Sequence, residues 1–369
     1  MNNKSVQISP WQFTILTSMF VVGSAVLFIP TILASVAKQD AWISCLIAII
    51  VGVLLAWFYG SFSKIDPNLS YFELAVFALG KWVGRCIALV TLSLHLVLSS
   101  FLLWDIGDFL VTQILVGTPI EVIYYLFIFV TIVYGVRLGI EPIARSAEIF
   151  IPWIFLIFIF IVIFLLPEAE AKNLFPIFEE GVRPILYGSY YVVGFPFVEM
   201  VLLLMITPHV SDKKKVTSAF IWGVVLGGAI LFSLTLLSIL VLGPDFSTRN
   251  EFPIYVLVKK ISIGNFLERI EVLIALIWFL SIFFKLALVS YSFLIGMSQL
   301  FNLKDYRPLT FPFGILVIVL TLIMIPSSIY LKAFSKYAST PYMILIGLIL
   351  PLVVFIMGKM KKKKSNTMQ

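Results

Sequence analysis

Ten long apolar runs constrain the fold of this chain more than any other feature of its sequence. A helix needs about 20 apolar residues to cross the hydrocarbon core of a membrane. Backbone groups that face lipid must be satisfied within their own segment, and the residue alternation of a membrane barrel is absent, so helices are required. The sequence predicts an all-α integral membrane protein with about ten transmembrane helices, at residues 11–37, 41–63, 84–113, 120–136, 146–166, 184–207, 216–243, 269–300, 309–326 and 337–358.

The composition supports the same fold class. With 61% hydrophobic and 12% charged residues, the 369-residue chain is too apolar for an ordinary soluble protein. Most connectors are short, so we expect a single membrane domain over residues 1–369. Five spans in each half would give two repeats, about 11–166 and 184–358. An odd number of spans per repeat forces opposite membrane orientations, which defines a 5+5 inverted repeat.

The positive charges predict the orientation of the chain. With the N-terminus in the cytoplasm, the inner connectors and termini carry sixteen Lys and Arg residues and the outer connectors nine. Cytoplasmic loops favour Lys and Arg, so both termini are expected inside. The basic cytoplasmic tail, residues 359–369, contains Lys361 to Lys364. It can serve as a topology signal or hold anionic lipid headgroups.

Two of the predicted spans, the first and the sixth, are interrupted at corresponding places. Gly23 and Ser24 lie near the centre of the first span, and the sixth contains Gly194, Phe195, Pro196 and Phe197. Such matched interruptions mark the binding sites of inverted-repeat transporters, because half-helix ends and free carbonyls can bind polar groups there. The predicted ligand-binding residues are Gly23, Ser24, Ala25, Gly194, Phe195, Pro196 and Phe197, with Phe195 and Phe197 closing over the ligand.

Each interruption also has a plainer interpretation. Small residues such as Gly23, Ser24 and Ala25 allow close helix–helix contact without unwinding. Proline lacks the N–H of its own turn, so Pro196 could bend the sixth span without opening it. A binding loop suits an amino acid zwitterion or a similar small polar molecule best.

Four charged residues lie at membrane depth: Asp105, Asp108, Glu199 and Lys285. Such charges are costly and are functional by default, so we assign all four to ion or proton coupling. Ser281, Lys285, Ser292 and Gln299 share one helix face, which we expect to face inward. The alternatives are hydrated aspartates near the end of the third span and a purely structural ion pair of Lys285 with Glu199 or an aspartate.

Other features carry less information about function. His95 is interpreted as a packing residue and His209 as interfacial, and the apolar stretch 253–263 is a possible lid. Cys45 and Cys86 have no disulfide or metal spacing. No enzyme motif, metal cluster or cofactor signature is present, so neither catalysis nor a cofactor is predicted.

The chain resembles the spore germination permeases, the B subunits of nutrient germinant receptors, within the amino acid, polyamine and organocation transporter superfamily. Short motifs in a specific order carry this resemblance, namely Gly80-Lys81-Trp82-Val83-Gly84, Thr118-Pro119-Ile120, Glu180-Gly181 with Arg183-Pro184, Phe195-Pro196-Phe197-Val198-Glu199 and Glu268-Arg269-Ile270-Glu271. Ala25 departs from the family, in which a second glycine is common at this place.

The resemblance implies a ten-helix transporter-like core that binds a nutrient germinant, often an amino acid. It also implies a germinant receptor A subunit and a lipoprotein C subunit as partners, in the spore inner membrane. The residues alone leave two other functions open. One is a stand-alone proton-coupled amino acid transporter, and the other is a scaffold or ion-conducting subunit without a ligand site.

Overall fold

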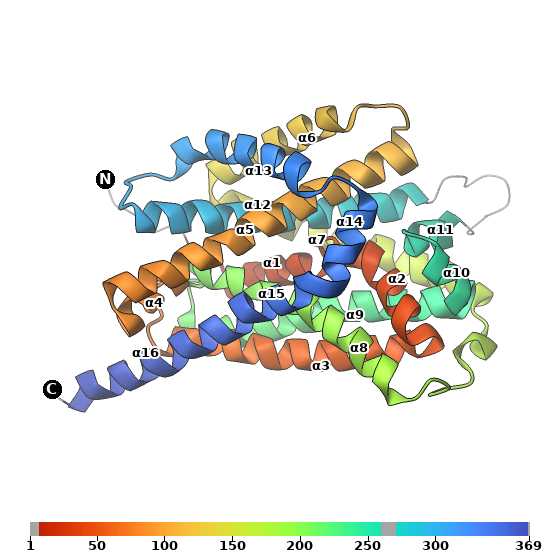
Figure 1. Cartoon of the computed structure of the whole chain (residues 1–369), viewed down its shortest axis with the longest axis horizontal. Coiled ribbons are helices and arrows are strands. Elements are labelled where there is room, and N and C mark those ends of the chain that lie inside the picture. Colours follow the sequence, from red (N-terminus) through yellow and green to blue (C-terminus); the bar gives the residue numbers. More distant parts are fainter. Residues whose placement is uncertain (1–6, 260–270, 368–369) are drawn as a thin grey trace.

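The computed structural model describes residues 7–259 and 271–367, and the regular structure within them is helical (Figure 1). In the first half of the chain the α-helices are α1 (Pro10–Val22), α2 (Ala25–Ala37), α3 (Ala41–Gly60), α4 (Tyr71–Leu79), α5 (Lys81–Phe109), α6 (Ile120–Ile128) and α7 (Ile140–Leu165). In the second half they are α8 (Val182–Val192), α9 (Val216–Leu242), α10 (Pro244–Arg249), α11 (Pro253–Lys259), α12 (Glu271–Leu300), α13 (Thr310–Met324), α14 (Ser328–Phe334), α15 (Thr340–Ile344) and α16 (Leu350–Thr367).

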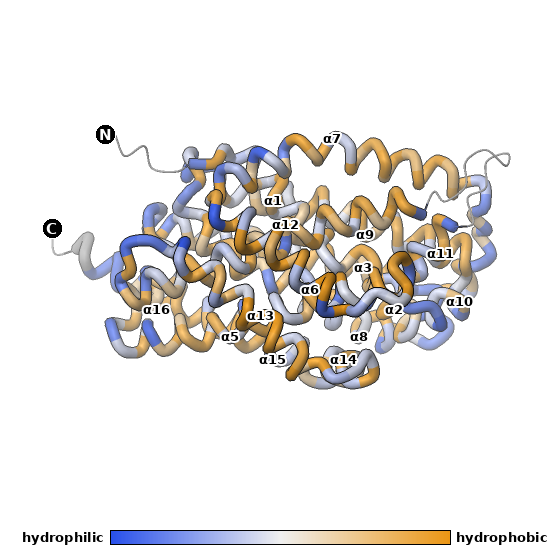
Figure 2. Tube along the Cα trace, turned by 90° about the horizontal axis from the view of Figure 1, so that it is seen from above, coloured by the Kyte–Doolittle hydropathy of each residue, from blue (hydrophilic) through white to orange (hydrophobic). Residues whose placement is uncertain are grey.

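The long axis of the molecule has the hydropathy profile of a membrane protein. Hydrophilic residues gather at its two ends and the length between them is mostly hydrophobic (Figure 2). Within the described residues, eight helical segments are long and apolar enough to cross a membrane, and Pro10–Val22 and Ile120–Val136 are shorter apolar segments. The predicted all-α membrane fold is therefore confirmed. The boundaries of the two repeats stay a prediction.

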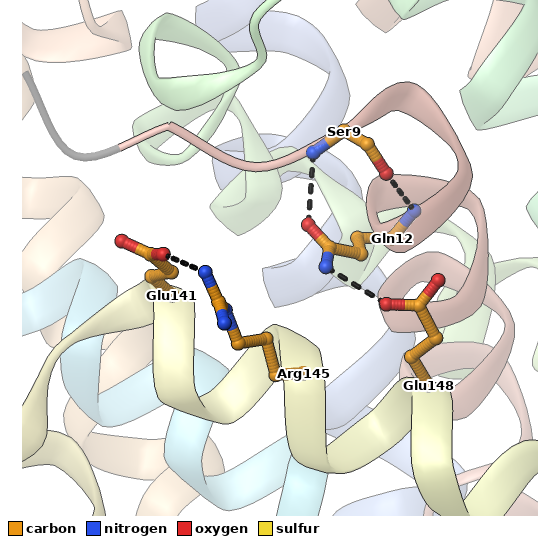
Figure 3. A network of polar contacts seen from close by, with 5 residues as sticks. All are labelled: Ser9, Gln12, Glu141, Arg145 and Glu148. Carbon is orange, nitrogen blue, oxygen red and sulfur yellow. Dashed lines mark hydrogen bonds and ion pairs between the residues drawn. The ribbon is translucent and has the colours of Figure 1, made fainter.

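Both chain ends lie at the left of Figure 1, which we call the terminal end, and α10 and α11 lie at the other, distal end. At the terminal end, backbone hydrogen bonds hold the start of α1. The Ile8 N–H donates to the His209 carbonyl and the Ser211 N–H donates to the Ile8 carbonyl, both at 2.9 Å. Ser9 and Gln12 form a capping box, and Gln12 Nε2 donates to Glu148 on α7 at 2.9 Å (Figure 3). The entry of α1 is therefore attached to the segment that follows the sixth span and to α7.

Short helices occupy two of the longer connectors. Helix α4 lies between the second and third predicted spans, and its capping box of Ser70 and Glu73 fixes where it begins. Helices α10 and α11 follow α9, and α11 packs against α2, α9 and α12. The predicted lid is thus a packed helix up to Lys259, and residues 260–263 lie outside the described residues.

Helix α1 is buried almost throughout and packs closely against α9. A Cβ at Gly223 on α9 would lie 2.5 Å from Thr17 Cβ and 2.8 Å from the Thr14 carbonyl oxygen on α1. Glycine therefore sets how near the two helices come, as small residues do at membrane helix contacts. This contact holds the first half of the broken span in the centre of the bundle.

We expect Gly223→Val to destabilise the protein by about 1–3 kcal/mol, because the added methyl groups overlap α1 in a close-packed interior. Ala229→Val is the matched control, since Ala229 lies on the same helix and is exposed. Thermal unfolding of the purified variants in detergent checks the difference. Equal unfolding temperatures for the two variants would contradict the assigned packing.

Candidate ligand-binding site

A cavity of about 480 Å³ lies between the two interrupted spans and extends toward the distal end. Helix α5 forms one wall, and the helical segment that runs from α14 into α15 forms another. Its lining is a mixture of aliphatic, aromatic, hydroxyl and carboxylate side chains, from Ser24, Phe28, Ile29, Thr31, Ile32, Ser35, Val36, Leu98, Phe101, Leu102, Trp104, Asp105, Tyr191, Val192, Phe195, Glu199, Thr248, Glu251, Ser328, Leu331, Ser335, Ser339, Thr340 and Met343.

The first interruption is a break of two residues between α1 and α2. Gly23 has φ 26° and ψ −128°, a positive-φ conformation that glycine adopts without a Cβ penalty. A Cβ here would also overlap the Lys285 side chain. The Gly23 carbonyl accepts a hydrogen bond from Ser281 Oγ at 3.0 Å. The break predicted from Gly23 and Ser24 is therefore confirmed, whereas Ala25 already belongs to α2, is buried and does not line the cavity.

The second interruption is a π-helical turn at Val193–Phe197, after which the chain continues as a 3₁₀ segment, Val198–Met205. Phe195 is extended, with φ −131° and ψ 110°, so the helix opens rather than merely bends. Gly194 allows close approach, because a Cβ there would lie 2.8 Å from Thr340 Cγ2. Pro196 has no N–H to leave unpaired at this depth.

Side chains from other helices bond to carbonyls of the 3₁₀ segment that follows the second interruption. Tyr59 Oη donates to the Val198 carbonyl at 3.1 Å, and Ser292 Oγ donates to the Leu202 carbonyl at 3.1 Å. Irregular backbone at membrane depth is tolerated only where protein or a water-filled cavity satisfies it. These hydroxyls therefore attach the second half of the sixth span to α3 and α12.

The two phenylalanines of the second interruption have different positions. Phe195 is half-buried and lines the cavity. Phe197 is fully buried and packs on α3, where a Cβ at Gly52 would lie 2.6 Å from Phe197 Cδ1. The expectation that both rings close over a ligand is therefore corrected for Phe197. The Phe197 ring fills the space left by the absent side chain of Gly52.

A buried ion pair joins the two interruptions. Lys285 Nζ lies 2.7 Å from Glu199 Oε2, and the two side chains are 0% and 1% exposed. The ammonium also lies 5.0 Å from the Phe20 ring centroid and 4.7 Å from that of Phe195. Lys285 thus contacts α1, the break at Gly23 and the sixth span together. The structural ion pair was one of the alternatives that the sequence left open.

The aspartates of α5 do not share one environment. Asp105 is 8% exposed and lines the cavity beside Ser24. Asp108 is half-buried, does not line the cavity and lies close enough to Tyr124 to affect it electrostatically. One helical turn thus separates a carboxylate that lines the cavity from one that does not, although both act electrostatically on Tyr124 of α6.

The predicted inward face of α12 is confirmed by its contacts. Ser281 bonds to the Gly23 carbonyl, Ser292 bonds to the Leu202 carbonyl, and Gln299 Oε1 accepts from Ser70 Oγ at 2.8 Å. His95 packs between the rings of Phe72 and Phe293, as a packing residue would.

The cavity wall formed by α14 and α15 was not predicted from the sequence. Ser328, Ser335, Ser339 and Met343 lie on this wall, and their spacings of seven, four and four place them on one helix face. That periodic row of hydroxyls was the signal available in the sequence. It was obscured because the predicted span began at residue 337, in the middle of the row.

We expect Lys285→Met and Glu199→Gln each to destabilise the protein by about 3–5 kcal/mol, because each leaves an uncompensated buried charge. The double variant should be less destabilised than the sum of the two, since neither charge remains. Thermal unfolding of the purified proteins tests this double-mutant cycle. Lys172→Met is the control, because the Lys172–Glu170 pair is exposed and is expected to contribute less than about 1 kcal/mol. Additive effects of the two buried substitutions would contradict the coupling.

Solved structures share the fold of this chain. Mhp1, a nucleobase-cation-symport-1 family transporter in a closed conformation with bromovinylhydantoin bound, superposes with a TM-score of 0.69 at 15% identity, over 95% of this chain and 77% of that chain. MhsT in complex with L-phenylalanine superposes with a TM-score of 0.56 at 16% identity, over 96% and 99%. At these identities the likeness concerns the fold, and it agrees with the broken helices described above.

Sequence relatives define the family. Spore germination protein KB of Bacillus subtilis is 28% identical over 98% of this chain and 97% of its own length. Spore germination protein A2 of the same organism is 24% identical over 97% of each chain. The family described as Spore germination protein (Spore_permease) matches residues 7–330, and it is a family of receptors and transporters rather than enzymes. This chain therefore belongs to the spore germination permease family.

Proposed function

We propose that this chain is the B subunit of a nutrient germinant receptor and that a small nutrient, an amino acid, binds in the cavity between the two broken spans. The observation that carries the proposal is the coincidence of this cavity with both interruptions, at Ser24 and at Phe195. Its volume of about 480 Å³ lies within the range of small-molecule sites.

The polar groups of the cavity suit an amino acid. Ser24 precedes the first turn of α2, whose N-terminus carries partial positive charge and can receive a carboxylate. The Ser24 hydroxyl is buried and forms no hydrogen bond of ordinary geometry within the described part of the chain. A bound carboxylate would accept that unused hydrogen bond. Gly23, Ala25, Gly194 and Pro196 then act through the backbone shape they permit.

Ligand binding is proposed to shift the population between two arrangements of the bundle. A ligand changes this equilibrium only through its difference in affinity for the two states. Partner subunits would detect the change, and family membership supports an A subunit and a lipoprotein C subunit in that role. The proposed location is the spore inner membrane, with both termini on the cytoplasmic or core side.

A stand-alone proton-coupled amino acid transporter is the second candidate function. The fold shared with Mhp1 and MhsT favours it. Asp105, Asp108, Glu199 and Lys285 would then handle the coupled charge. The two functions differ in whether the chain alone concentrates a solute.

The deciding experiment compares germination with uptake. Spores that carry this chain and its partners are exposed to a panel of amino acids, sugars and nucleosides, and the chain alone in vesicles is assayed for radiolabelled uptake of the same compounds. We expect a nutrient-specific germination response without concentrative uptake. Concentrative, pH-dependent uptake by the chain alone would instead establish the transporter function.

We expect Ile32→Trp to raise the nutrient concentration for half-maximal germination at least roughly tenfold, because overpacking of about 1–3 kcal/mol would oppose the ligand in the cavity. Ile50→Trp is the matched control, since Ile50 is exposed on the outer face of α3. Dose–response curves of spores with equal amounts of each variant give the comparison. An unchanged response of Ile32→Trp would place the ligand elsewhere.

A further inference from the structure

We infer that Asp105 binds a positively charged nitrogen of the ligand, so that the cavity selects amines and amino acids over neutral nutrients of similar size. This inference rests on the proposed function of the cavity and gives Asp105 a role in ligand recognition instead of ion coupling. The carboxylate lies in the cavity wall, on α5, beside the break at Ser24.

Asp105 is nearly buried but borders the cavity. Its side chain is 8% exposed, yet it lines the cavity, so the remaining exposure is toward the space a ligand would fill. The Ser24 hydroxyl lies close enough to interact with the carboxylate but makes no hydrogen bond of ordinary geometry. Two buried polar groups therefore face the same part of the cavity with unused bonding capacity.

The charged side chains among the described lining residues of the cavity are acidic. The carboxylates among the described lining residues are Asp105, Glu199 and Glu251, and no Lys or Arg is among those lining residues. Lys285 lies behind the wall at 2.7 Å from Glu199 and compensates that carboxylate. Its attraction to Asp105 acts over a longer distance than an ion pair. Glu251 lies at the distal end and has an interaction of its own.

A buried carboxylate without a close counter-charge is energetically unfavourable. A positively charged ligand therefore binds more favourably, because it supplies that counter-charge. When ionised, Asp105 carries one negative charge beyond the Lys285–Glu199 pair, and one ammonium group would compensate that charge. A neutral sugar or nucleoside would leave that charge uncompensated. The site therefore favours a charged nitrogen through its own electrostatics.

Aromatic side chains form part of the apolar wall of the cavity. Phe28, Phe101, Trp104 and Phe195 line the cavity around Asp105. Aromatic faces attract cations, and the Phe195 ring already lies 4.7 Å from one ammonium, that of Lys285. The same rings can accommodate an apolar substituent. The ligand class is thus a small primary amine with an apolar side chain, of which hydrophobic amino acids are the common example.

The test uses paired ligands that differ only at the nitrogen. Spores with this chain and its partners are exposed to L-alanine and L-lactate, L-leucine and L-leucic acid, and L-phenylalanine and L-3-phenyllactate, with inosine and glucose as neutral nutrients. We expect germination with at least one amino acid and none with its hydroxy acid. Asp105→Asn should raise the half-maximal concentration of that amino acid by roughly 10- to 100-fold, the contribution of a charged hydrogen bond.

Asp108→Asn is the matched control, because it removes the same charge one turn away and outside the cavity. We expect it to change the half-maximal concentration less than about threefold. Asp105→Glu keeps the charge and should retain more of the response than Asp105→Asn. If Asp105→Asn does not accumulate in the membrane, the paired ligands on the unmodified chain decide the question alone.

Three results would overturn the inference. The first is an equal response to an amino acid and its hydroxy acid, and the second is a wild-type response of Asp105→Asn. The third is a germination response that depends on NaCl or KCl in the unmodified chain but not in Asp105→Asn. That result would assign the carboxylate to an inorganic cation. Germination by inosine or glucose that survives Asp105→Asn would leave the receptor function standing and refute only the role of Asp105. Uptake by the chain alone without any germination response would refute the receptor function itself.

Discussion

The architecture depends on satisfying backbone groups that two broken helices release inside a membrane. Neither break can exist in lipid, because each frees carbonyl and amide groups that water does not reach. Helix α12 contacts both broken spans: Ser281 donates to the Gly23 carbonyl at the first break, and Ser292 donates to the Leu202 carbonyl in the 3₁₀ segment that follows the second break. Between them Lys285 pairs with Glu199. One face of one helix thus supports both interruptions, and the cavity lies beside that support.

The Lys285–Glu199 ion pair contributes to the structure in a different way from these hydrogen bonds. A buried pair contributes little net stability relative to an apolar pair, but its loss on one side is costly, so it specifies one arrangement of the elements it joins. Lys285 passes over Gly23, where only glycine leaves room, and ends at Glu199 one turn after Phe195. A side chain as long as lysine is needed for that path. The pair therefore fixes the relative position of the two interruptions that border the cavity.

Much of this organisation was predictable, because its causes are local. Long apolar runs predict helices, Gly23-Ser24 and Gly194 with Pro196 predict the breaks, and the spacing of Ser281, Lys285 and Ser292 predicts an inward face. Contacts between distant segments were not predictable in the same way. Phe195 and Phe197 are two residues apart in an irregular turn, and only packing against Gly52 sends Phe197 away from the cavity. Asp105 and Asp108 share a helix face, yet Asp105 lines the cavity and Asp108 does not.

The contacts of α12 also connect the cavity to the terminal end of the bundle. Tyr291 lies two turns after Lys285 on this helix, and its hydroxyl is 3.5 Å from His209 Nε2. His209 in turn accepts, through its carbonyl, the backbone hydrogen bond from Ile8 that holds the start of α1. A ligand in the proposed site that alters the environment of Glu199 would therefore act on a helix that also contacts the terminal end. Because packed interiors rearrange between discrete states rather than deform continuously, such a change would be transmitted as a shift between two arrangements. The proposed receptor function requires this physical property.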